Sequence, residues 1–504
     1  MCTEESGTPS DEFYANAFVL HSQGLQQTDT EGIFQNIPRP ETTRPGPQLV
    51  EDLIQDVGSN VDKKLLGQNL LDSFALILAR PGGKGVVAVV IEKQKDQNTY
   101  KLHVSMNNTP NKASKLLAEK IQEWFSNRGQ DTVESGHLRA QSILWDDILR
   151  NCCQNISTSI ANACIGGTEE EKHELLQGTL LYVRNLNITL NKRGEEEKKV
   201  EKVLDLLSTF FNTSASNNSN ISNLGASRGV SIYSERREYA HGNGRMLRFL
   251  HDITEECFGL VESHAAAMRN YLNDLNNKLQ RKLEGKASED VENHRRLLGR
   301  VRSLIYTIAK YVRAWYDIVH FKAHCNSADL VFNFDLGEGR RPGGCGLDFD
   351  KILSQAAQLG IFDEANKESM EAFHDVEQNC ISAWNHCEMQ MLEFVLAKEE
   401  SRFYNYVGCS KGPCWLCYHV LVNMTSQFEM RPSHFKLYPR WLPPNFTKDQ
   451  AHKERFVAVL KLLTKEMRRL IDLRKGGEYR PRNAKPDCPD DEDTFLSLRE
   501  APKS

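Results

Sequence analysis

The sequence predicts a mixed α/β protein in which a small strand-bearing part is split by a long helical block. Two β-branched runs, at 85–93 and 99–106, are separated by a polar turn, which is typical of a hairpin. A third strand is predicted at 402–410 between two helices, and most of 111–335 has helical patterning. At 504 residues the chain is too long for one ordinary core, so several domains or a large insertion are expected.

The first part of the chain combines a polar arm with a helix and the hairpin. Residues 1–48 include IPRPETTRPGPQ and show little apolar periodicity, which predicts a flexible arm. Apolar residues at helical spacing then predict a helix over 62–78 that ends before the Pro-Gly-Gly of 81–83. The hairpin of 85–106 follows directly.

The middle of the chain is predicted to be helical throughout. Apolar residues recur at helical spacing over 111–335, interrupted by a polar low-complexity stretch at 212–229 that predicts a loop. A Gly-rich break at 337–346 separates this block from the rest of the chain. We therefore predict a helical domain or insertion at 111–335.

The last part of the chain returns to alternating helices and strands. A helix is predicted at 386–400, a strand at 402–410, and a further helix that opens on PCWLC. A short extended piece at 434–441 precedes a C-terminal helix at 449–473. The Pro- and charge-rich residues 475–504 predict a disordered tail.

Charge and cysteine usage narrow the class of protein. The net charge is −5, so no global basic field indicates nucleic acid, and such a partner would need a local patch. The acidic start of the chain differs from a signal peptide, and no long apolar run predicts a membrane span, so we expect an intracellular protein, cytoplasmic or nuclear, with no membrane partner. In such a compartment the 13 cysteines favour free thiols and metal ligands over disulfides.

Two short motifs predict a catalytic zinc site. His386-Cys387-Glu388 opens one predicted helix and Pro413-Cys414-Trp415-Leu416-Cys417 opens another, which is the H-x-E and P-C-x-x-C pattern of zinc-dependent nucleobase deaminases. A helix N-terminus favours thiolate, so Cys414 and Cys417 are expected to bind Zn²⁺ together with His386. Three protein ligands leave one position for water, and Glu388 is then the general acid and base.

Two other interpretations of the cysteine pair stay open at this stage. Cys409 lies five residues before Cys414 and could complete a closed, purely structural Cys₃His site. A C-x-x-C pair can also be a redox motif, although no suitable β-α-β pattern surrounds it here. Glu388 argues against the closed site, because a structural zinc does not need it.

The segment 386–417 resembles the cytidine-deaminase-like superfamily, and YVGCSKGPCWLC is similar to the fungal-type putative nucleic-acid or nucleotide deaminases. The resemblance implies a three-layer fold with a central mixed sheet, and hydrolytic loss of ammonia from a cyclic amidine of a nucleobase. Such a fold needs a helix and a hairpin before the zinc helix. We therefore expect 60–108 and 375–445 to form one deaminase domain, split by the helical insertion.

The resemblance also implies substrate contacts. In the superfamily an asparagine at the end of the second strand commonly binds the substrate sugar, and Asn107 and Asn108 occupy the matching place, where Asn-Asn-Thr-Pro is also ordinary turn chemistry. Trp441 and Tyr438 could stack on a base or pack as half-buried strand residues. The basic stretch 461–485 could bind phosphate or be a solvated helix face.

Two functions from different classes remain. The first is a zinc-dependent deaminase acting on a base in a nucleotide or single-stranded nucleic acid. The second is a non-catalytic scaffold in which a zinc-stabilised deaminase fold is retained and the helical block binds protein partners. The presence of both the zinc ligands and Glu388 favours the first, and the size of the insertion favours the second.

Overall fold

The protein divides into two compact units, which the computed structural model describes in part. Unit 1 comprises Met1–Leu138, Asp317–Asp490 and Pro502–Ser504, and unit 2 comprises Arg139–Tyr316 and Asp491–Ala501. The described residues are 9–22, 63–79, 85–94, 100–107, 112–126, 143–164, 168–190, 195–216, 239–283, 289–324, 333–336, 347–371, 374–375, 380–381, 383–398, 402–425, 428–431, 433, 436–444 and 450–476. Among them no helix is both long and apolar enough to cross a membrane.

The described part of unit 2 is helical. Its helices are α4 (Ile143–Ala163), α5 (Glu169–Leu190), α6 (Glu195–Ser216), α8 (Tyr239–Leu283) and α9 (Glu289–His324), the last of which continues into unit 1. They bury a core in which the Trp145 and Trp315 rings stack with centroids 6.3 Å apart. Together with unit 1, this makes the protein mostly helical, with one main mixed sheet.

The sheet of unit 1 brings together strands from distant parts of the chain. Its strands are β1 (Val87–Lys93), β2 (Tyr100–Met106), β3 (Asn333–Leu336), β8 (Arg402–Phe403), β9 (Tyr406–Cys409) and β10 (Glu429–Met430), in the order β10-β9-β1-β2-β3 with β8 also on β1. β1 and β2 form the expected hairpin, with Val87 opposite Met106. β9 pairs antiparallel with β1, with Ala88 opposite Cys409. The hairpin and the 402–410 strand therefore share one sheet.

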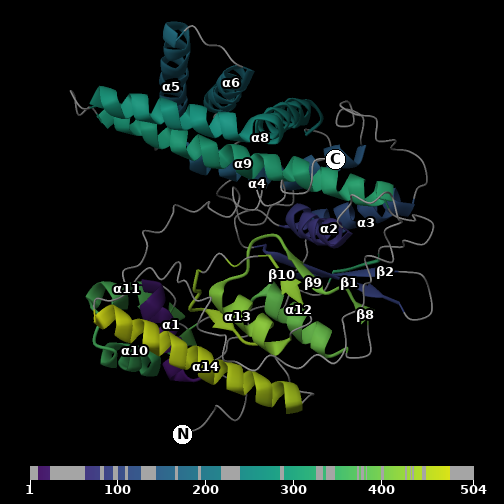
Figure 1. Cartoon of the computed structure of the whole chain (residues 1–504), viewed down its shortest axis with the longest axis vertical. Helices are drawn as coiled ribbons and strands as arrows, with labels where there is room; N and C mark the ends of the chain where they lie inside the picture. The colour runs from purple at the N-terminus through teal and green to yellow at the C-terminus, as the bar shows by residue number, and fades with distance from the viewer. Residues whose placement is uncertain are drawn as a thin grey trace. The chain divides into compact units, whose positions relative to one another are not determined.

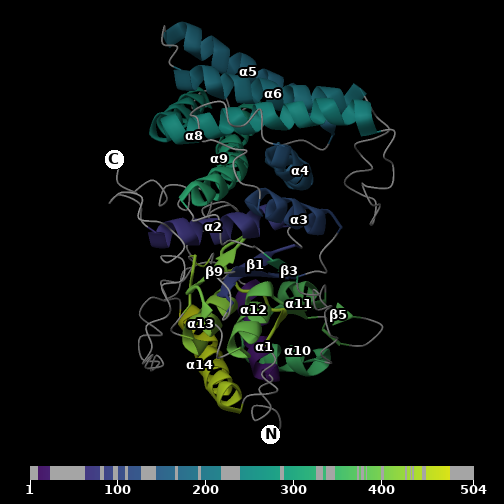
Figure 2. The ribbon, with the colours of Figure 1, turned by 90° about the vertical axis from the view of Figure 1, so that its right-hand side faces the viewer.

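Helices cover both faces of this sheet (Figures 1 and 2). On one face lie α2 (Lys63–Leu78) and α3 (Lys112–Ser126), and on the other lie α12 (Cys387–Leu396) and α13 (Trp415–Met424). The central strand β1 is apolar on both faces and buried over most of its length, as a strand between two helical layers must be.

Helix α2 packs directly on the backbone of β9. A Cβ added at Gly408 would lie 2.4 Å from the Leu71 carbonyl carbon, so only glycine permits this approach. The half-buried Asp72 carboxylate accepts hydrogen bonds from the Cys409 N–H and the Tyr406 hydroxyl, each at 2.8 Å. These contacts fix β9, and with it the start of the P-C-x-x-C segment that follows.

A second group of helices packs beside α13. It contains α1 (Asp11–Ser22), α10 (Phe349–Gln358), α11 (Glu364–Glu371) and α14 (Gln450–Lys475), with the short strands β4 (Leu347–Asp348), β5 (His374–Asp375), β6 (Cys380–Ile381), β7 (Trp384–Asn385) and β11 (Trp441–Leu442). β7 and β11 pair in parallel, with Trp384 opposite Trp441. This pairing joins the residues just before the H-x-E motif to the chain just before α14.

The N-terminal segment differs from the expected flexible arm. Within 1–48, α1 is a helix whose residues Phe13–Leu20 are all buried against α10, α11 and α14. A helix that is enclosed on all sides needs no polar face, so its sequence lacks the amphipathic period by which helices are recognised. The remaining residues of 1–48 that lie outside 9–22 are not among those described.

The limits of the helical block also differ from the range 111–335. α3 packs on α2 and β3, and β3 pairs in parallel with β2, so both belong to unit 1. β3 is a four-residue strand, NFDL, beside a Gly-rich break, which is too short to show a period of two. The C-terminal helix α14 lies close to its predicted range, and the tail after 476 is outside the described residues.

The close approach of α2 to β9 yields a stability prediction. Gly408→Ala is expected to lower the free energy of unfolding by about 1–3 kcal/mol, the usual cost of forcing an extra methyl into packed structure. Urea denaturation measures the change. Gly299→Ala is the matched control, because nothing lies within 4 Å of its added methyl and helical Ala is favoured over Gly by roughly 0.5–1 kcal/mol. Equal stability of the two variants would contradict the proposed contact.

Candidate metal centre and active site

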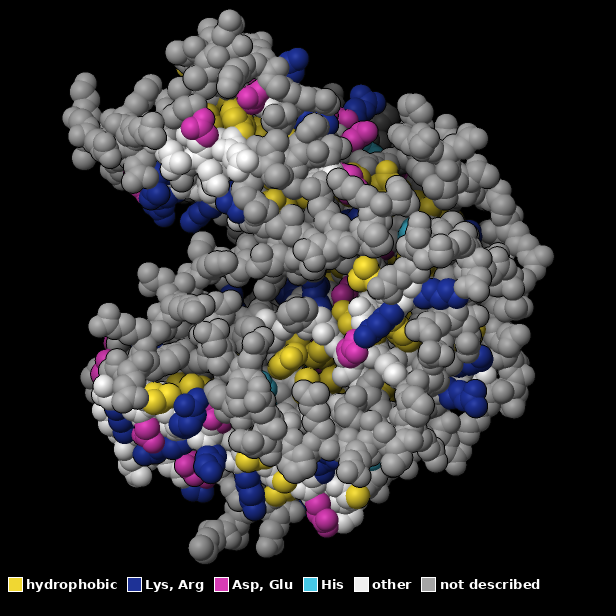
Figure 3. Space-filling view, viewed as in Figure 1, with side chains coloured by type: hydrophobic (Ala, Val, Ile, Leu, Met, Phe, Trp, Pro, Cys, Tyr) yellow, Lys and Arg dark blue, Asp and Glu magenta, His cyan; other side chains and the backbone are white. Residues whose placement is uncertain are grey.

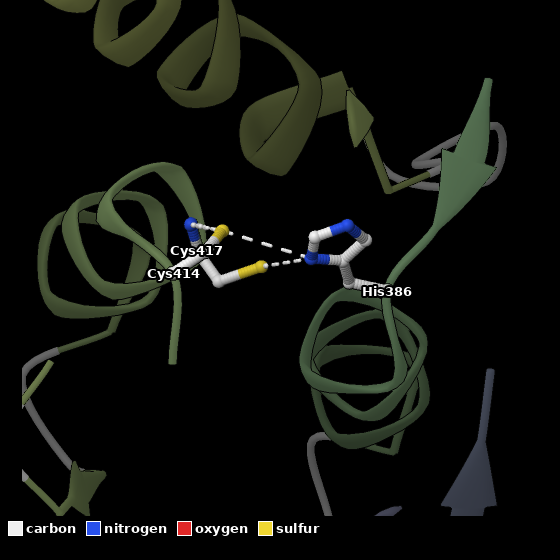
Figure 4. A group of neighbouring side chains, drawn as sticks. All are labelled: His386, Cys414 and Cys417. Carbon is white, nitrogen blue, oxygen red and sulfur yellow. Dashed lines mark hydrogen bonds between the residues drawn. The ribbon is translucent and has the colours of Figure 1, made fainter. Parts of the chain in front are cut away.

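Three predicted zinc ligands meet where two helices begin. His386 is the N-cap residue of α12 and Cys414 is the N-cap residue of α13, with Cys417 in the first turn of α13. Their ligand atoms all lie within 4.8 Å of one another, and Figure 4 shows the imidazole directed at both sulfurs. Both cysteines are buried and the histidine is half-buried.

The separations within this cluster fit a tetrahedral zinc ion. The His386 Nδ1 atom lies 3.6 Å from the Cys414 sulfur and 3.4 Å from the Cys417 sulfur. Zn–N bonds of about 2.0–2.1 Å and Zn–S bonds of about 2.3 Å, at tetrahedral angles, place such atoms about 3.5 Å apart. His386, Cys414 and Cys417 therefore form a suitable donor set for Zn²⁺, with one coordination position left over.

The electrostatics of the two thiols differ. Burial raises the pKa of Cys414, but the hydrogen bonds with Cys417 and the adjacent His386 outweigh this and hold the pKa well below its ordinary value. Burial, and then the neighbouring Cys414 sulfur, raise the pKa of Cys417 well above its ordinary value. The Cys414 thiolate thus forms readily, and its negative charge opposes ionisation of the Cys417 thiol. A divalent cation removes this conflict, because it stabilises both thiolates.

Glu388 lies beside the cluster and is not part of its ligand group. Its carboxyl is almost fully buried in the first turn of α12, with Oε2 3.9 Å from the Cys417 sulfur and 3.4 Å from the Cys387 sulfur. Burial raises its pKa above the ordinary range, and His386 acts in the opposite direction. A carboxyl group with a raised pKa, adjacent to a metal site, is well placed to accept and return a proton.

The alternative closed site is not formed. Cys409 is described and buried, yet it is not among the residues that could share a metal, and its sulfur lies 3.8 Å from the Val407 carbonyl oxygen. Cys409 belongs to β9, where its backbone N–H is bonded to Asp72. The donor set seen among the described residues therefore has three members, His386, Cys414 and Cys417.

Asn107 lies at the centre but makes a contact that the sequence does not indicate. It follows β2, and its side-chain oxygen accepts a hydrogen bond of 2.6 Å from the backbone N–H of Cys387. The amide oxygen is therefore engaged by α12. The sugar contact implied by the resemblance stays untested, and Asn108 lies outside the described residues.

Trp441 does not form a stacking platform, which corrects the expectation from the sequence. Its side chain is fully buried, and its ring lies against Phe13 of α1 with centroids 6.0 Å apart. Its backbone pairs with Trp384, and its carbonyl accepts a hydrogen bond from the Tyr14 hydroxyl. The indole is therefore buried and presents no exposed ring face to a base.

Tyr438, by contrast, lies open beside the metal cluster. Its side chain is 39% exposed, and its ring meets the His386 imidazole edge to face, with centroids 5.7 Å apart. The chain around it is held at two points, because the Lys436 carbonyl accepts from the Trp415 N–H and the Arg440 carbonyl accepts from the Trp384 N–H. The 436–442 segment therefore holds a partly exposed aromatic ring beside His386.

The described part of the basic stretch 461–485 has the features of a solvated helix face. Arg469 forms a two-pronged ion pair with Glu466, and Arg468 lies 3.5 Å from Asp472. A shallow surface groove along α14 is lined by side chains of both positive and negative charge, including Lys465 and Glu12. On the face seen in Figure 3, Lys and Arg side chains likewise lie among Asp and Glu. Phosphate binding by this stretch has no support in these contacts.

Comparison with known proteins agrees with the site. A family model described as "OTT_1508_deam:-like deaminase" matches residues 385–445, the span that holds both zinc motifs and Tyr438. No curated protein and no solved structure matches the chain. The match supports a deaminase family for this segment and is compatible with metal binding by the His/Cys/Cys cluster.

The geometry predicts one tightly bound zinc ion per chain. Protein purified without added zinc is expected to contain one equivalent by elemental analysis, and Cys414→Ser or Cys417→Ser is expected to lose most of it, because a hydroxyl is a poor substitute for thiolate. Cys409→Ser is the matched control and should keep the metal. Loss of zinc in the Cys409 variant would instead favour the closed site.

Proposed function

We propose that this protein is a zinc-dependent hydrolytic deaminase that acts on a nucleobase in a nucleotide or a single-stranded nucleic acid. The observation that supports this most directly is the placement of Glu388. Its buried carboxyl lies beside a three-donor metal cluster, within the segment that matches a deaminase family. A structural zinc site has no use for such a group. The sequence YVGCSKGPCWLC favours the fungal-type branch of these deaminases.

The proposed domain is the split three-layer deaminase fold. Its halves are 60–108 and 375–445, interrupted by the helical insertion. The pairing of β1 with β9 supports this, since it joins the two halves in one sheet. The helices on both faces of that sheet support it further.

Each residue of the site has a defined task in this proposal. His386, Cys414 and Cys417 would hold Zn²⁺, which would supply a Lewis acid that makes water a nucleophile near neutral pH. Glu388 takes one proton from water as the water oxygen attacks the amino-bearing ring carbon, and gives it to the ring nitrogen. The same carboxyl then takes the second proton from the hydroxyl now on that carbon and gives it to the amine, which leaves as ammonia as the C–N bond breaks and the carbonyl forms.

Tyr438 is the proposed wall of the base pocket. Its ring is supported on one side by His386 and is partly exposed, although exposing an aromatic ring to water is unfavourable. A planar base would cover this exposed surface. Stacking on an aromatic side chain stabilises a bound base by about 1–3 kcal/mol and tolerates different bases.

The scaffold hypothesis predicts a different outcome. Unit 2 forms a separate helical body, which a protein partner could bind. A scaffold would bind zinc and show no turnover. Release of ammonia from nucleosides, nucleotides and oligonucleotides, screened with purified protein, separates the two hypotheses and identifies the substrate.

Replacing Glu388 tests catalysis. Glu388→Gln keeps the size of the side chain but removes the proton acceptor, so turnover is expected to fall by about 10²–10⁴ while zinc content is retained. Glu393→Gln makes the same change further along α12 and serves as the control. Cys387 is unsuitable as a control because its sulfur contacts Glu388. Unchanged turnover in Glu388→Gln would refute the catalytic assignment.

Replacing Tyr438 tests the pocket wall. Tyr438→Leu is expected to raise KM by about 5–150-fold, corresponding to the loss of one base stack of about 1–3 kcal/mol. Tyr438→Phe keeps the ring and should stay near the wild type. Steady-state kinetics on the substrate found by ammonia release measure both variants. If Leu and Phe behave alike, the ring does not stack on the base.

A further inference from the structure

The first turn of α12 lacks a cap of its own. The first N–H groups of any helix have no partner within the helix and need acceptors from elsewhere. The N-cap residue, His386, has extended backbone angles of φ −67° and ψ 147° but makes no side-chain capping hydrogen bond. Its imidazole is directed at Cys414 and Cys417 instead. A residue that binds the metal from the N-cap position therefore leaves the capping role open.

Asn107 fills this role from a distant part of the chain. Its side-chain oxygen accepts the Cys387 N–H at 2.6 Å across a separation of 280 residues. Its own backbone N–H donates to the Val86 carbonyl, 3.1 Å away, which anchors the residue at the end of the hairpin. The sheet thus fixes the backbone of Asn107, the residue whose side-chain oxygen is the acceptor.

The other zinc helix needs no such help. At the start of α13 the Cys414 sulfur accepts the Cys417 N–H at 3.3 Å, so this ligand caps its own helix. Sulfur can bind a metal and accept an N–H at once, whereas the imidazole cannot turn back onto its own helix while facing the metal. The two helix starts of the centre therefore differ in what holds them.

A second side-chain amide, that of Gln390, also holds the start of α12 in place. The Gln390 amide donates to the Asn385 carbonyl at 2.9 Å, and its oxygen accepts from the Ser105 hydroxyl at 3.0 Å. Ser105 and Asn107 both belong to the end of β2, so the hairpin contacts α12 on either side of Glu388. Any shift of this turn would move His386 and Glu388 together.

We propose that Asn107 is a positioning residue of the metal centre: its side-chain oxygen, by capping α12, sets the placement of His386 and Glu388. This task uses one lone pair of the amide oxygen, which leaves the amide nitrogen and the second lone pair for the sugar contact of the related deaminases. The zinc part of the test is independent of the proposed function, and the turnover part depends on it.

Two substitutions separate the amide oxygen from the amide nitrogen. Asn107→Asp keeps an acceptor and loses the donor, while Asn107→Leu has similar size and loses both. Chelator competition is expected to show zinc bound about 10–100-fold more weakly by Asn107→Leu, the usual effect of losing a group that orients a ligand. Asn107→Asp should bind zinc like the wild type, since Asp and Asn cap equally well. The Co²⁺-substituted protein should show an altered absorption spectrum only for Asn107→Leu.

Kinetics give an independent readout on the same variants. Asn107→Leu is expected to lower kcat with little change in KM, because Glu388 is displaced while the pocket wall remains. Gln68→Leu removes an exposed amide of α2 that contacts Glu429 and serves as the control. If Asn107→Leu does not fold by circular dichroism, Asn107→Ala is measured in the same way.

Three results would overturn the proposal. One is wild-type zinc affinity and Co²⁺ spectrum in both Asn107→Leu and Asn107→Ala. Another is an equal rise in KM for the Asp and Leu variants with zinc unchanged, which would assign Asn107 to the substrate. The third is weaker zinc binding in Asn107→Asp than in Asn107→Leu. A zinc-binding protein with no deaminase activity would refute the proposed function but leave the positioning role testable by metal affinity.

Discussion

Two helix N-termini have to meet at one point for this centre to exist. His386 and Cys414 are both N-cap residues, so each ligand side chain leaves its helix where the backbone N–H groups gather and the helix dipole favours negative charge. The sequence of neither helix determines where the other helix lies. Both are placed by one sheet, whose central strand β1 pairs with the hairpin strand β2 and with β9, the strand that leads into α13.

The contacts that place these helices come from the first part of the chain. The backbone of α2 touches β9 at Gly408, and Asp72 holds the amide of Cys409, just before the P-C-x-x-C segment. Asn107 holds the start of α12. One half of the unit therefore supplies the His/Cys/Cys group, and the other half supplies hydrogen bonds that position it.

The 436–442 segment links the centre to the surrounding core. It receives a backbone hydrogen bond from each side of the site, through Trp384 and Trp415. From behind it is braced by α1, since Tyr14 bonds to the Trp441 carbonyl and His21 to the Leu437 carbonyl. These contacts explain how Tyr438 can stay beside His386 with part of its ring exposed.

The sequence by itself identified the His/Cys/Cys group that the structure brings together. The H-x-E and P-C-x-x-C spacings are local, and a helix start places residues one to three positions apart in a known way, so the proximity of His386, Glu388, Cys414 and Cys417 could be predicted without a structure. The hairpin and most helices of both units followed from local periodicity. The tertiary structure alone decided the rest. α1 lacks a polar face because it is enclosed, Trp441 is buried with its ring against Phe13 of that same helix, and Asn107 caps a helix 280 residues away. In each case the deciding contact joins segments that are far apart in the chain, and no local pattern records such a contact.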